Sequence, residues 1–294
     1  MLFDVVHTTD YRYSEPVSEA YLEARLTPPH REEQQIISHK IEFQPGAAMS
    51  DYVDYFGNST TFYSMTLRHE RLTVTNRMTV ETKHRKPFGE ALALPLAEAR
   101  QILTSSLTDI FDYLQPTPAV PTGGVSTEWA KKLLRGNIPV GEAVESLNRA
   151  IHEKFEYKPG STELNTPLAT VWKKRAGVCQ DFAHIMLSVL RTAGLPSRYV
   201  CGYIESDAPS EPGPGGRKLI GSVATHAWVE VMLPGMQWLA LDPTNNQWCG
   251  ERHITVSLGR DFEDAAPVRG TFKGSGSQSM KVRVTMKRLS GKTP

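Results

Sequence analysis

The chain has 294 residues, which exceeds one average domain, so one large or two modest domains are expected. Hydrophobic residues make up 39% of the sequence, enough to build a core, and the formal net charge is only +1. This near-neutral balance gives no reason to expect nucleic acid or an anionic membrane surface as a partner.

Cysteine usage and targeting signals favour a cytoplasmic protein. The three cysteines, at positions 179, 201 and 249, include no CxxC pair, which argues against a disulfide scaffold and against a cysteine zinc site. The sequence does not start with a basic segment followed by an apolar stretch, and no run of roughly 18 apolar residues occurs. We therefore expect a cytoplasmic protein with no membrane partner and no bound metal.

The first 86 residues have the composition of β-strands. In the stretch "RLTVTNRMTV" (71–80), apolar residues on one face, beginning with Leu72 and ending with Val80, alternate with Thr and Arg on the other. Such alternation is typical of a half-buried strand. Other segments of strand composition are separated by turn residues such as "FGNST". The sequence thus predicts an antiparallel β-sandwich-like N-terminal domain over residues 1–86.

Residues 87–294 predict a second, mixed domain whose core lies at about 140–250. The proline- and glycine-rich stretch "QPTPAVPTGG" (115–124) marks a boundary or a long loop, and "ESDAPSEPGPGGRK" (205–218) marks another loop. A strand at about 280–287 alternates apolar with mostly basic residues, and it can pack back on the sheet. Helices are expected in part of 90–114, at 127–136 and at 140–157, and strands at 197–204, 222–233 and 237–242.

The stretch "RAGVCQDFAHIMLSVLRTAGL" (175–195) predicts a helix with a cysteine at its start. From Val178 onward, apolar residues recur on one stripe about 100° wide, and Cys179 lies on the shoulder of that stripe in the first turn. The free backbone N–H groups of a first turn favour a thiolate and can stabilise an oxyanion beside it. Gly177 lets the chain turn sharply into the helix.

A base and a residue to orient it are found in "THAWVEVMLPGMQWLALDPT" (225–244). If residues 234–236 form a three-residue connection, Leu233 pairs with Gln237, and His226 becomes the diagonal neighbour of Asp242 on one face. A two-residue connection would place these two side chains on opposite faces. The three-residue register therefore gives the geometry of a Cys–His–Asp triad.

Three blocks of this sequence resemble the core of the transglutaminase-like superfamily, which has a papain-like fold. They are "GVCQDFAHIMLSVLRTAGLPSRYVCGY", "THAWVEV" and "WLALDPTNNQ". The segments "YRYSEPV", "EARLTP" and "DYFGN" resemble the β-rich module that precedes this core in bacterial transglutaminase-like cysteine proteases. The resemblance implies an α+β fold, with Cys179 as nucleophile, His226 as base and Asp242 as its orienting residue.

Several functions remain open for this set of residues. Thiol-dependent hydrolysis of a peptide or protein amide is our first expectation, a protein-glutamine γ-glutamyltransferase the second, and a non-catalytic peptide-binding module the third. Gln180 and Trp172 are candidates for a second oxyanion donor, and Trp228 for lining the site. No cofactor is expected, and the sequence does not indicate the oligomeric state.

Overall fold

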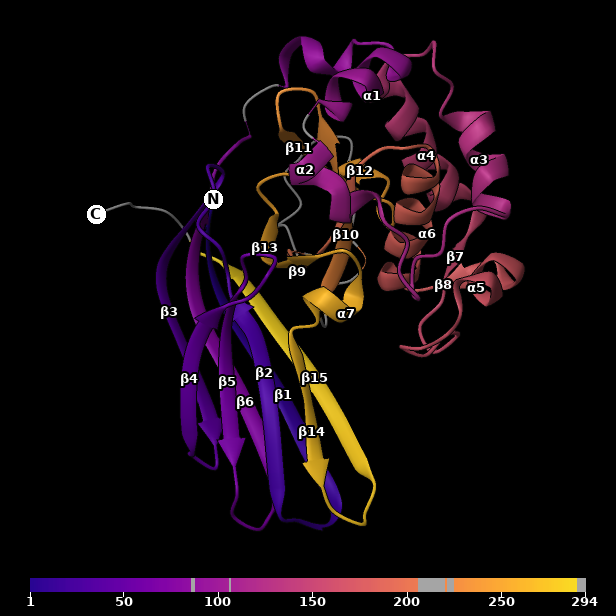
Figure 1. Cartoon of the computed structure of the whole chain (residues 1–294). Coiled ribbons are helices and arrows are strands. Elements are labelled where there is room, and N and C mark those ends of the chain that lie inside the picture. Colours follow the sequence, from indigo (N-terminus) through magenta and orange to yellow (C-terminus); the bar gives the residue numbers. More distant parts are fainter. Residues whose placement is uncertain (86–87, 106, 206–219, 221–224, 290–294) are drawn as a thin grey trace, which may run out of the picture.

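The computed structural model describes residues 1–85, 88–105, 107–205, 220 and 225–289, and it consists of a β-sandwich and a helix-covered sheet that lie side by side (Figure 1). Most of the loop expected at 205–218 falls outside the described residues, as does the beginning of the strand expected at 222–233. Within the described part of the chain, none of the helices is long and apolar enough to cross a membrane.

The first 82 residues form strands, as the composition predicts. The alternation at 71–80 is confirmed, because Leu72, Val74, Met78 and Val80 are each at most 1% exposed while Thr and Arg between them reach solvent. The strands are β1 (Leu2–Val17), β2 (Glu19–Thr27), β3 (Gln34–Gln44), β4 (Ala48–Val53), β5 (Ser59–Met65) and β6 (His69–Thr82).

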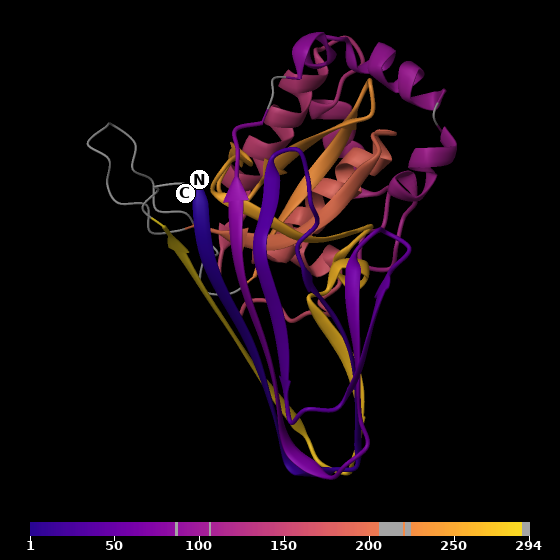
Figure 2. The ribbon, with the colours of Figure 1, turned by 90° about the vertical axis from the view of Figure 1, so that its left-hand side faces the viewer.

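Two antiparallel sheets, in the orders β15-β1-β6-β3 and β14-β2-β5-β4, form the sandwich. Its last two strands, β14 (Val268–Lys273) and β15 (Gln278–Arg288), come from the C-terminal end of the chain. Figure 2 shows both yellow strands diverging from one turn at the lower end, each along its own sheet. Residues 268–288 thus belong with the N-terminal strands, which differs from the predicted division of the chain into 1–86 and 87–294. The boundary at residue 86 itself stays a prediction.

The middle of the chain is helical where the periodicity predicts helices, and the stretch 115–124 contains none. The helical segments are η1 (Gly89–Leu92), α1 (Leu96–Thr104), α2 (Leu107–Ile110), η2 (Phe111–Leu114), α3 (Val125–Leu133), α4 (Val140–Lys154), α5 (Leu168–Lys174), α6 (Cys179–Thr192) and α7 (Phe262–Ala265).

A third sheet, with five strands in the order β12-β11-β10-β9-β13, supports these helices. Helix α6 packs on β9 and β10 with one side and on α3, α4 and α5 with the other. The predicted stripe of α6 is buried, but its polar positions are buried too, because the helix is surrounded. The strands of this part are β7 (Glu156–Tyr157), β8 (Ala176–Gly177), β9 (Ser197–Ile204), β10 (His226–Leu233), β11 (Gln237–Asp242), β12 (Gln247–Trp248) and β13 (His253–Gly259).

The sandwich and the five-stranded sheet share a buried interface. Apolar side chains of β1 and β6 form one cluster with those of β9 and β13. Beside it, the fully buried carboxylate of Glu230 on β10 forms ion pairs with Arg31 of the sandwich, at 2.7 Å, and with Arg198 of β9, at 2.6 Å. Breaking a buried pair of this kind is strongly destabilising, so the sandwich is fixed against the sheet.

Candidate active site

The start of helix α6 is shaped by a close approach of the backbone to a carboxylate. Asp181 Oδ2 accepts the backbone N–H of Val178 at 2.8 Å and the hydroxyl of Thr162 at 2.7 Å. A Cβ atom at Gly177 would lie 2.6 Å from the same oxygen, so only glycine fits there. Helix α6 begins two residues later, at the half-buried Cys179.

The position of Cys179 gives its sulfur an environment suited to negative charge. As the first residue of a 14-residue helix, it lies beside backbone N–H groups that have no partner within the helix. The positive end of the helix dipole favours a thiolate over a thiol. The same N–H groups can donate to an oxyanion that forms next to the sulfur.

The hairpin of β10 and β11 has the predicted three-residue connection. Leu233 pairs with Gln237, and Gly235 adopts a φ of +82°, a conformation that glycine takes without strain. The same register brings together the side chains of His226, at the start of β10, and Asp242, at the end of β11. The Nε2 atom of His226 lies 2.9 Å from Oδ2 of Asp242, and both side chains are buried.

Asp242 is held by further donors. Its Oδ1 accepts the backbone N–H groups of Thr244 and Asn245 at 2.9 and 3.1 Å, and the Asn245 amide donates to Oδ2 at 2.7 Å. The Nε2 atom of His253 lies 3.4 Å from the same oxygen. These contacts fix the carboxylate in the orientation that faces His226.

Electrostatic attraction stabilises the charged forms of His226 and Asp242. Burial alone would lower the pKa of His226, but the charge and hydrogen bond of Asp242, together with Cys179, raise it to about 10. Burial opposes the charged form of Asp242, yet His226 and His253 hold its pKa far below the ordinary value. Cys179 and His226 line the same cavity, so the thiol and the imidazole ring face one space. Nδ1 of His226 is buried and makes no hydrogen bond within the described residues, so it is available to the thiol.

The other two cysteines have different surroundings. Burial, with the charge of Cys179, raises the pKa of Cys201 to about 12. Burial, with the charges of Asp242 and Glu230, raises the pKa of Cys249 well above its ordinary value. Both side chains therefore stay protonated at neutral pH. Among the described residues, no group of three or more His, Cys, Asp and Glu side chains has metal-binding geometry.

The remaining predicted site residues differ in placement. Gln180 lines the cavity beside Cys179, and its amide donates to the carbonyl oxygen of Leu164 at 3.2 Å. Trp172 is not among the cavity residues; it packs in an aromatic cluster with Trp129, at 4.9 Å between ring centroids. Trp228 is buried behind His226, at 6.1 Å between centroids, and does not line the cavity.

Sequence reasoning missed three residues of the site. Tyr157 lines the cavity with Cys179, and burial, with the charges of Cys179 and Asp242, raises its pKa to about 12. Asn245 and His253 contact Asp242. The asparagine, three residues beyond Asp242 in "DPTNNQ", has the spacing of a turn contact, whereas no local pattern marks Tyr157 or His253.

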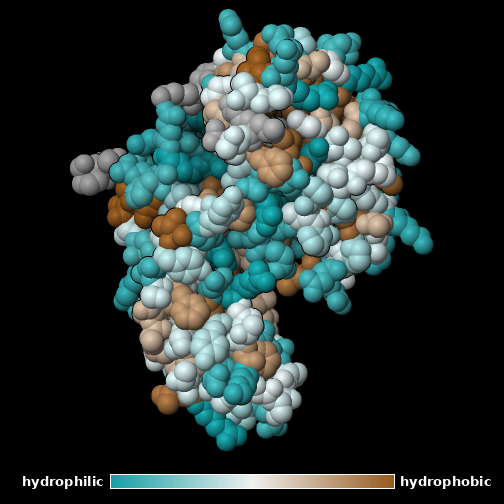
Figure 3. Space-filling view, in the orientation of Figure 1, coloured by the Kyte–Doolittle hydropathy of each residue, from teal (hydrophilic) through white to brown (hydrophobic). Residues whose placement is uncertain are grey.

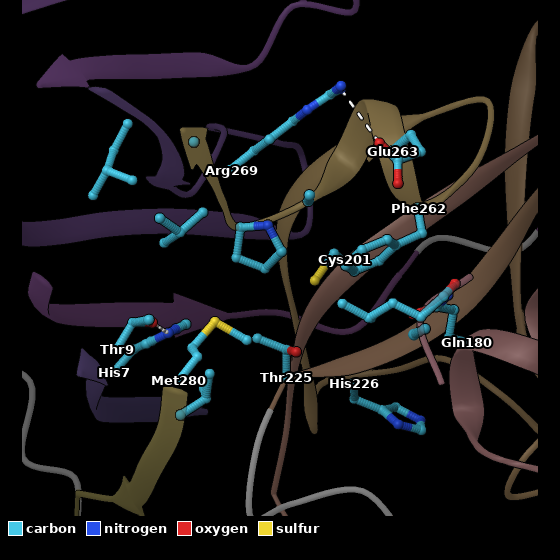
Figure 4. A pocket seen from close by; sticks show the side chains of 18 of the residues that line it. His7, Thr9, Gln180, Cys201, Thr225, His226, Phe262, Glu263, Arg269 and Met280 are labelled. Atoms are coloured by element: carbon cyan, nitrogen blue, oxygen red, sulfur yellow. Dashed lines mark hydrogen bonds and ion pairs between the residues drawn. The ribbon is translucent and has the colours of Figure 1, made fainter. Parts of the chain in front are cut away.

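A cavity of about 510 Å³ lies between the sandwich and the helix-covered sheet, and Cys179 and His226 open into it. Figure 4 shows His7, Thr9 and Met280 of the sandwich on one side, and Gln180, His226 and Phe262 on the other. The arrangement combines a thiol at a helix N-terminus, an imidazole held by a carboxylate, and space for a ligand. It can form and break a bond at an acyl carbon.

Comparisons with known proteins place this chain in a family. Residues 3–81 match the family described as bacterial transglutaminase-like N-terminal region, and residues 127–243 match the transglutaminase-like superfamily. An uncharacterised protein of Mycobacterium leprae is 34% identical over 286 residues, which cover 97% of this chain and 98% of that protein.

Two further similarities bear on fold and chemistry. A crystal structure described as that of a candidate cysteine protease from Cytophaga hutchinsonii has a TM-score of 0.74 at 20% identity and covers 99% of this chain and 92% of its own. This likeness confirms the predicted fold. A protein-glutamine γ-glutamyltransferase of Pseudomonas aeruginosa is 39% identical over 101 residues, which are 33% of this chain and 14% of that protein.

Proposed function

Because this chain belongs to the transglutaminase-like superfamily, we propose that it is an enzyme that transfers acyl groups from amides through a thioester on Cys179. The observation that carries the proposal is the buried His226–Asp242 pair, joined at 2.9 Å beside Cys179. Burying an ion pair costs desolvation free energy, so such a pair is more often kept for function than for stability. Its position next to a thiol at a helix start is the one that nucleophilic catalysis requires.

The chemistry follows from these three side chains. With the pKa of His226 raised to about 10, the Cys179 proton is held on Nδ1 of its imidazole, and the thiolate sulfur bonds to the substrate carbonyl carbon. The imidazolium then protonates the departing nitrogen, the C–N bond breaks, and a thioester and a free amine result. Water gives its proton to His226 and attacks the thioester, the C–S bond breaks, and a carboxylic acid leaves. Asp242 orients the imidazole and stabilises its charged form throughout.

The oxyanion of each tetrahedral intermediate needs donors beside the sulfur. Backbone N–H groups in the first turn of α6 supply the first of them. Gln180 and Tyr157 both line the cavity there. We assign the second donor to the Tyr157 hydroxyl, because one N–H of the Gln180 amide holds that side chain against the Leu164 carbonyl. A Tyr157→Phe protein is expected to lose roughly 10²-fold in kcat with little change in KM.

Water is the acceptor that the cavity favours. A lysine side chain that approached the thioester would bring an ammonium group, which a nearby carboxylate would attract. Among the described residues that line the cavity, the only acidic side chain is that of Glu263, which is paired with Arg269 at 3.4 Å. We therefore place peptide or protein amide hydrolysis first. The match to a protein-glutamine γ-glutamyltransferase supports transfer to an amine as the second candidate.

Product analysis tests both candidates. The purified protein is incubated with a mixture of peptides in H₂¹⁸O, with and without an added primary amine, and the products are identified by mass spectrometry. Hydrolysis puts one ¹⁸O into each new carboxylate, whereas transfer adds the mass of the amine to glutamine side chains. We expect ¹⁸O incorporation that persists when the amine is present, and no product from a Cys179→Ala protein.

Two outcomes would change the assignment. Dominant amine incorporation would make the protein a transferase and leave the triad in place. Equal product formation by the Cys179→Ala protein, or none by either protein while peptides still bind, would remove the catalytic role of Cys179 and favour a peptide-binding module.

A further inference from the structure

The cavity beside Cys179 continues into the open side of the sandwich. Strands β14 and β15 are joined by only four residues, 274–277, but they pair with different sheets and separate toward the active site (Figures 1 and 2). Four successive residues of β14, from Val268 to Thr271, line the cavity, as do alternate residues of β15, namely Gln278, Met280 and Val282.

This difference in lining shows which surface each strand presents. Successive side chains of a strand point to opposite faces, so alternate residues mean that β15 presents one face. Four successive residues line one cavity only if the backbone edge of the strand faces it. β14 pairs with β2 alone among the described strands, so its second edge has backbone N–H and C=O groups free to pair.

Two buried tyrosines face the same space. Tyr11 and Tyr13 of β1 are 4% and 8% exposed, and both line the cavity. Burial raises the pKa of each hydroxyl, and within the described part of the chain neither hydroxyl has a hydrogen-bond partner. Each hydroxyl oxygen keeps some exposure on a residue that lines the cavity, so it can pair with a ligand that enters there.

The tyrosines lie in a largely apolar part of the lining with Leu22, Val268, Met280 and Val282, although Thr9, Thr271 and Gln278 add polar groups. Among the described lining residues, Arg269 and Glu263 are paired with each other. The face of the molecule seen in Figure 3 is mostly hydrophilic or neutral, with small separate hydrophobic patches. An uncompensated charge would be costly to bury in such a cavity.

We propose that the acyl-donor peptide binds as an extended strand along the free edge of β14, with apolar side chains against Met280 and Val282 and its backbone hydrogen-bonded to the hydroxyls of Tyr11 and Tyr13. This inference rests on the proposed function, because it places the substrate carbonyl at Cys179. The substrate class is an extended, apolar peptide segment. Backbone pairing supplies affinity, and the pockets for alternate side chains supply selectivity.

Matched alkylating probes test this substrate class without a known substrate. Acetyl-Leu-Val-Ala chloromethyl ketone and acetyl-Asp-Asn-Ala chloromethyl ketone both lose chloride as the Cys179 sulfur bonds to carbon, and intact-protein mass spectrometry follows the rate. Burying one Leu or Val side chain is worth about a factor of ten or more in binding. We therefore expect the apolar probe to label Cys179 at least about tenfold faster than the acidic probe.

Variants of the cavity wall complete the experiment. Val282→Arg puts a charge on the lining face of β15 and is expected to abolish the preference, whereas Thr285→Arg puts the same charge on the exposed face and should preserve it. The double variant Tyr11→Phe, Tyr13→Phe keeps the packing and should slow both peptide probes severalfold. It also gives a readout if Val282→Arg fails to fold.

Iodoacetamide separates this inference from the proposed function, because it reaches the thiol without using the cavity wall. If iodoacetamide labels Cys179 no faster than the other two cysteines, the proposed function fails. If labelling by iodoacetamide is selective but the two peptide probes react equally, or both Arg variants behave alike, the peptide site along β14 is overturned and the proposed function stands.

Discussion

Two cysteines line the same cavity from different elements, and their surroundings differ in every respect that controls reactivity. Cys179 is the first residue of α6 and is half-buried, next to free backbone N–H groups and a charged imidazole. Cys201 lies in the middle of β9 and is 2% exposed. Its strand neighbours Ala227 and Ser257 occupy both sides, so its backbone groups are engaged in the sheet.

The comparison shows that the element carrying a thiol decides its chemistry. A helix start leaves N–H donors unpaired and orders them around one point, whereas a central strand uses its donors in the ladder. Burial therefore has opposite effects on the reactivity of the thiol at Cys201 and at Cys179. It keeps Cys201 protonated, with a pKa of about 12, while at Cys179 it strengthens the attraction between His226 and its partners.

The largest difference between Cys179 and Cys201 is expected when each thiol is removed in turn. Cys179→Ala should reduce hydrolytic activity by roughly 10⁶-fold, since no other group can form the thioester. Cys201→Ala, in the same cavity, should change activity by no more than about twofold, because its thiol plays no part in the reaction. Initial rates of product formation measure both, and a large loss in Cys201→Ala alone would reverse the assignment.

Removing the charge of Asp242 is expected to have the second largest effect. Asp242→Asn keeps the size of the side chain but removes the charge that raises the pKa of His226, so kcat should fall roughly 10⁴-fold. Titration of the His226 ring signals by NMR should show a lower pKa than in the unaltered protein. An unchanged pKa in this variant would contradict the role of Asp242, whatever the activity.

Alkylation compares the thiols directly in one molecule. At pH 7, iodoacetamide should modify Cys179 at least roughly 10³-fold faster than Cys201, because a thiol with a pKa of about 12 is almost fully protonated and its sulfur is shielded. Peptide mapping of the modified sites gives both rates. After addition of denaturant the two rates should converge, which is the internal control.

The smallest effect is on stability, and its sign follows from His226. The folded-state pKa is about 10 and the ordinary value is 6.5, so the stabilisation from its charge is complete below about pH 6.5 and is lost as pH rises through about 10. The midpoint of thermal unfolding should therefore fall by several degrees between about pH 7 and pH 10. Asp242→Asn should flatten this slope, whereas Cys201→Ala should leave it intact.

Sequence reasoning succeeded where the cause is local. The alternation of 71–80, the apolar stripe after Val178 and the three-residue hairpin at Pro234 each depend on neighbours in the chain. The hairpin register alone brought His226 to Asp242. The burial of α6 on all sides from Asp181 to Arg191 was not foreseen, because periodicity describes one face and not what packs on the others.

The remaining features depend on contacts between distant segments. The alternation of residues 280–287 predicts a strand, but nothing in it shows that the partner is β1. Tyr157 reaches the site because the two-residue β7 pairs with β8, which precedes Cys179. His253 and Tyr11 have ordinary local contexts, and only the tertiary arrangement places them beside Asp242 and the cavity.

The pairing of β1 with β15 also determines when the cavity can form during protein synthesis. The two strands lie at opposite ends of the sequence, so a ribosome that adds about 5–20 residues per second makes them on the order of tens of seconds apart. The nucleophile, its base and the sheet that holds them are synthesised within that interval. The wall of the cavity formed by β14 and β15 is made after the catalytic residues, so the nascent chain cannot hold a peptide beside Cys179 until β15 has been synthesised.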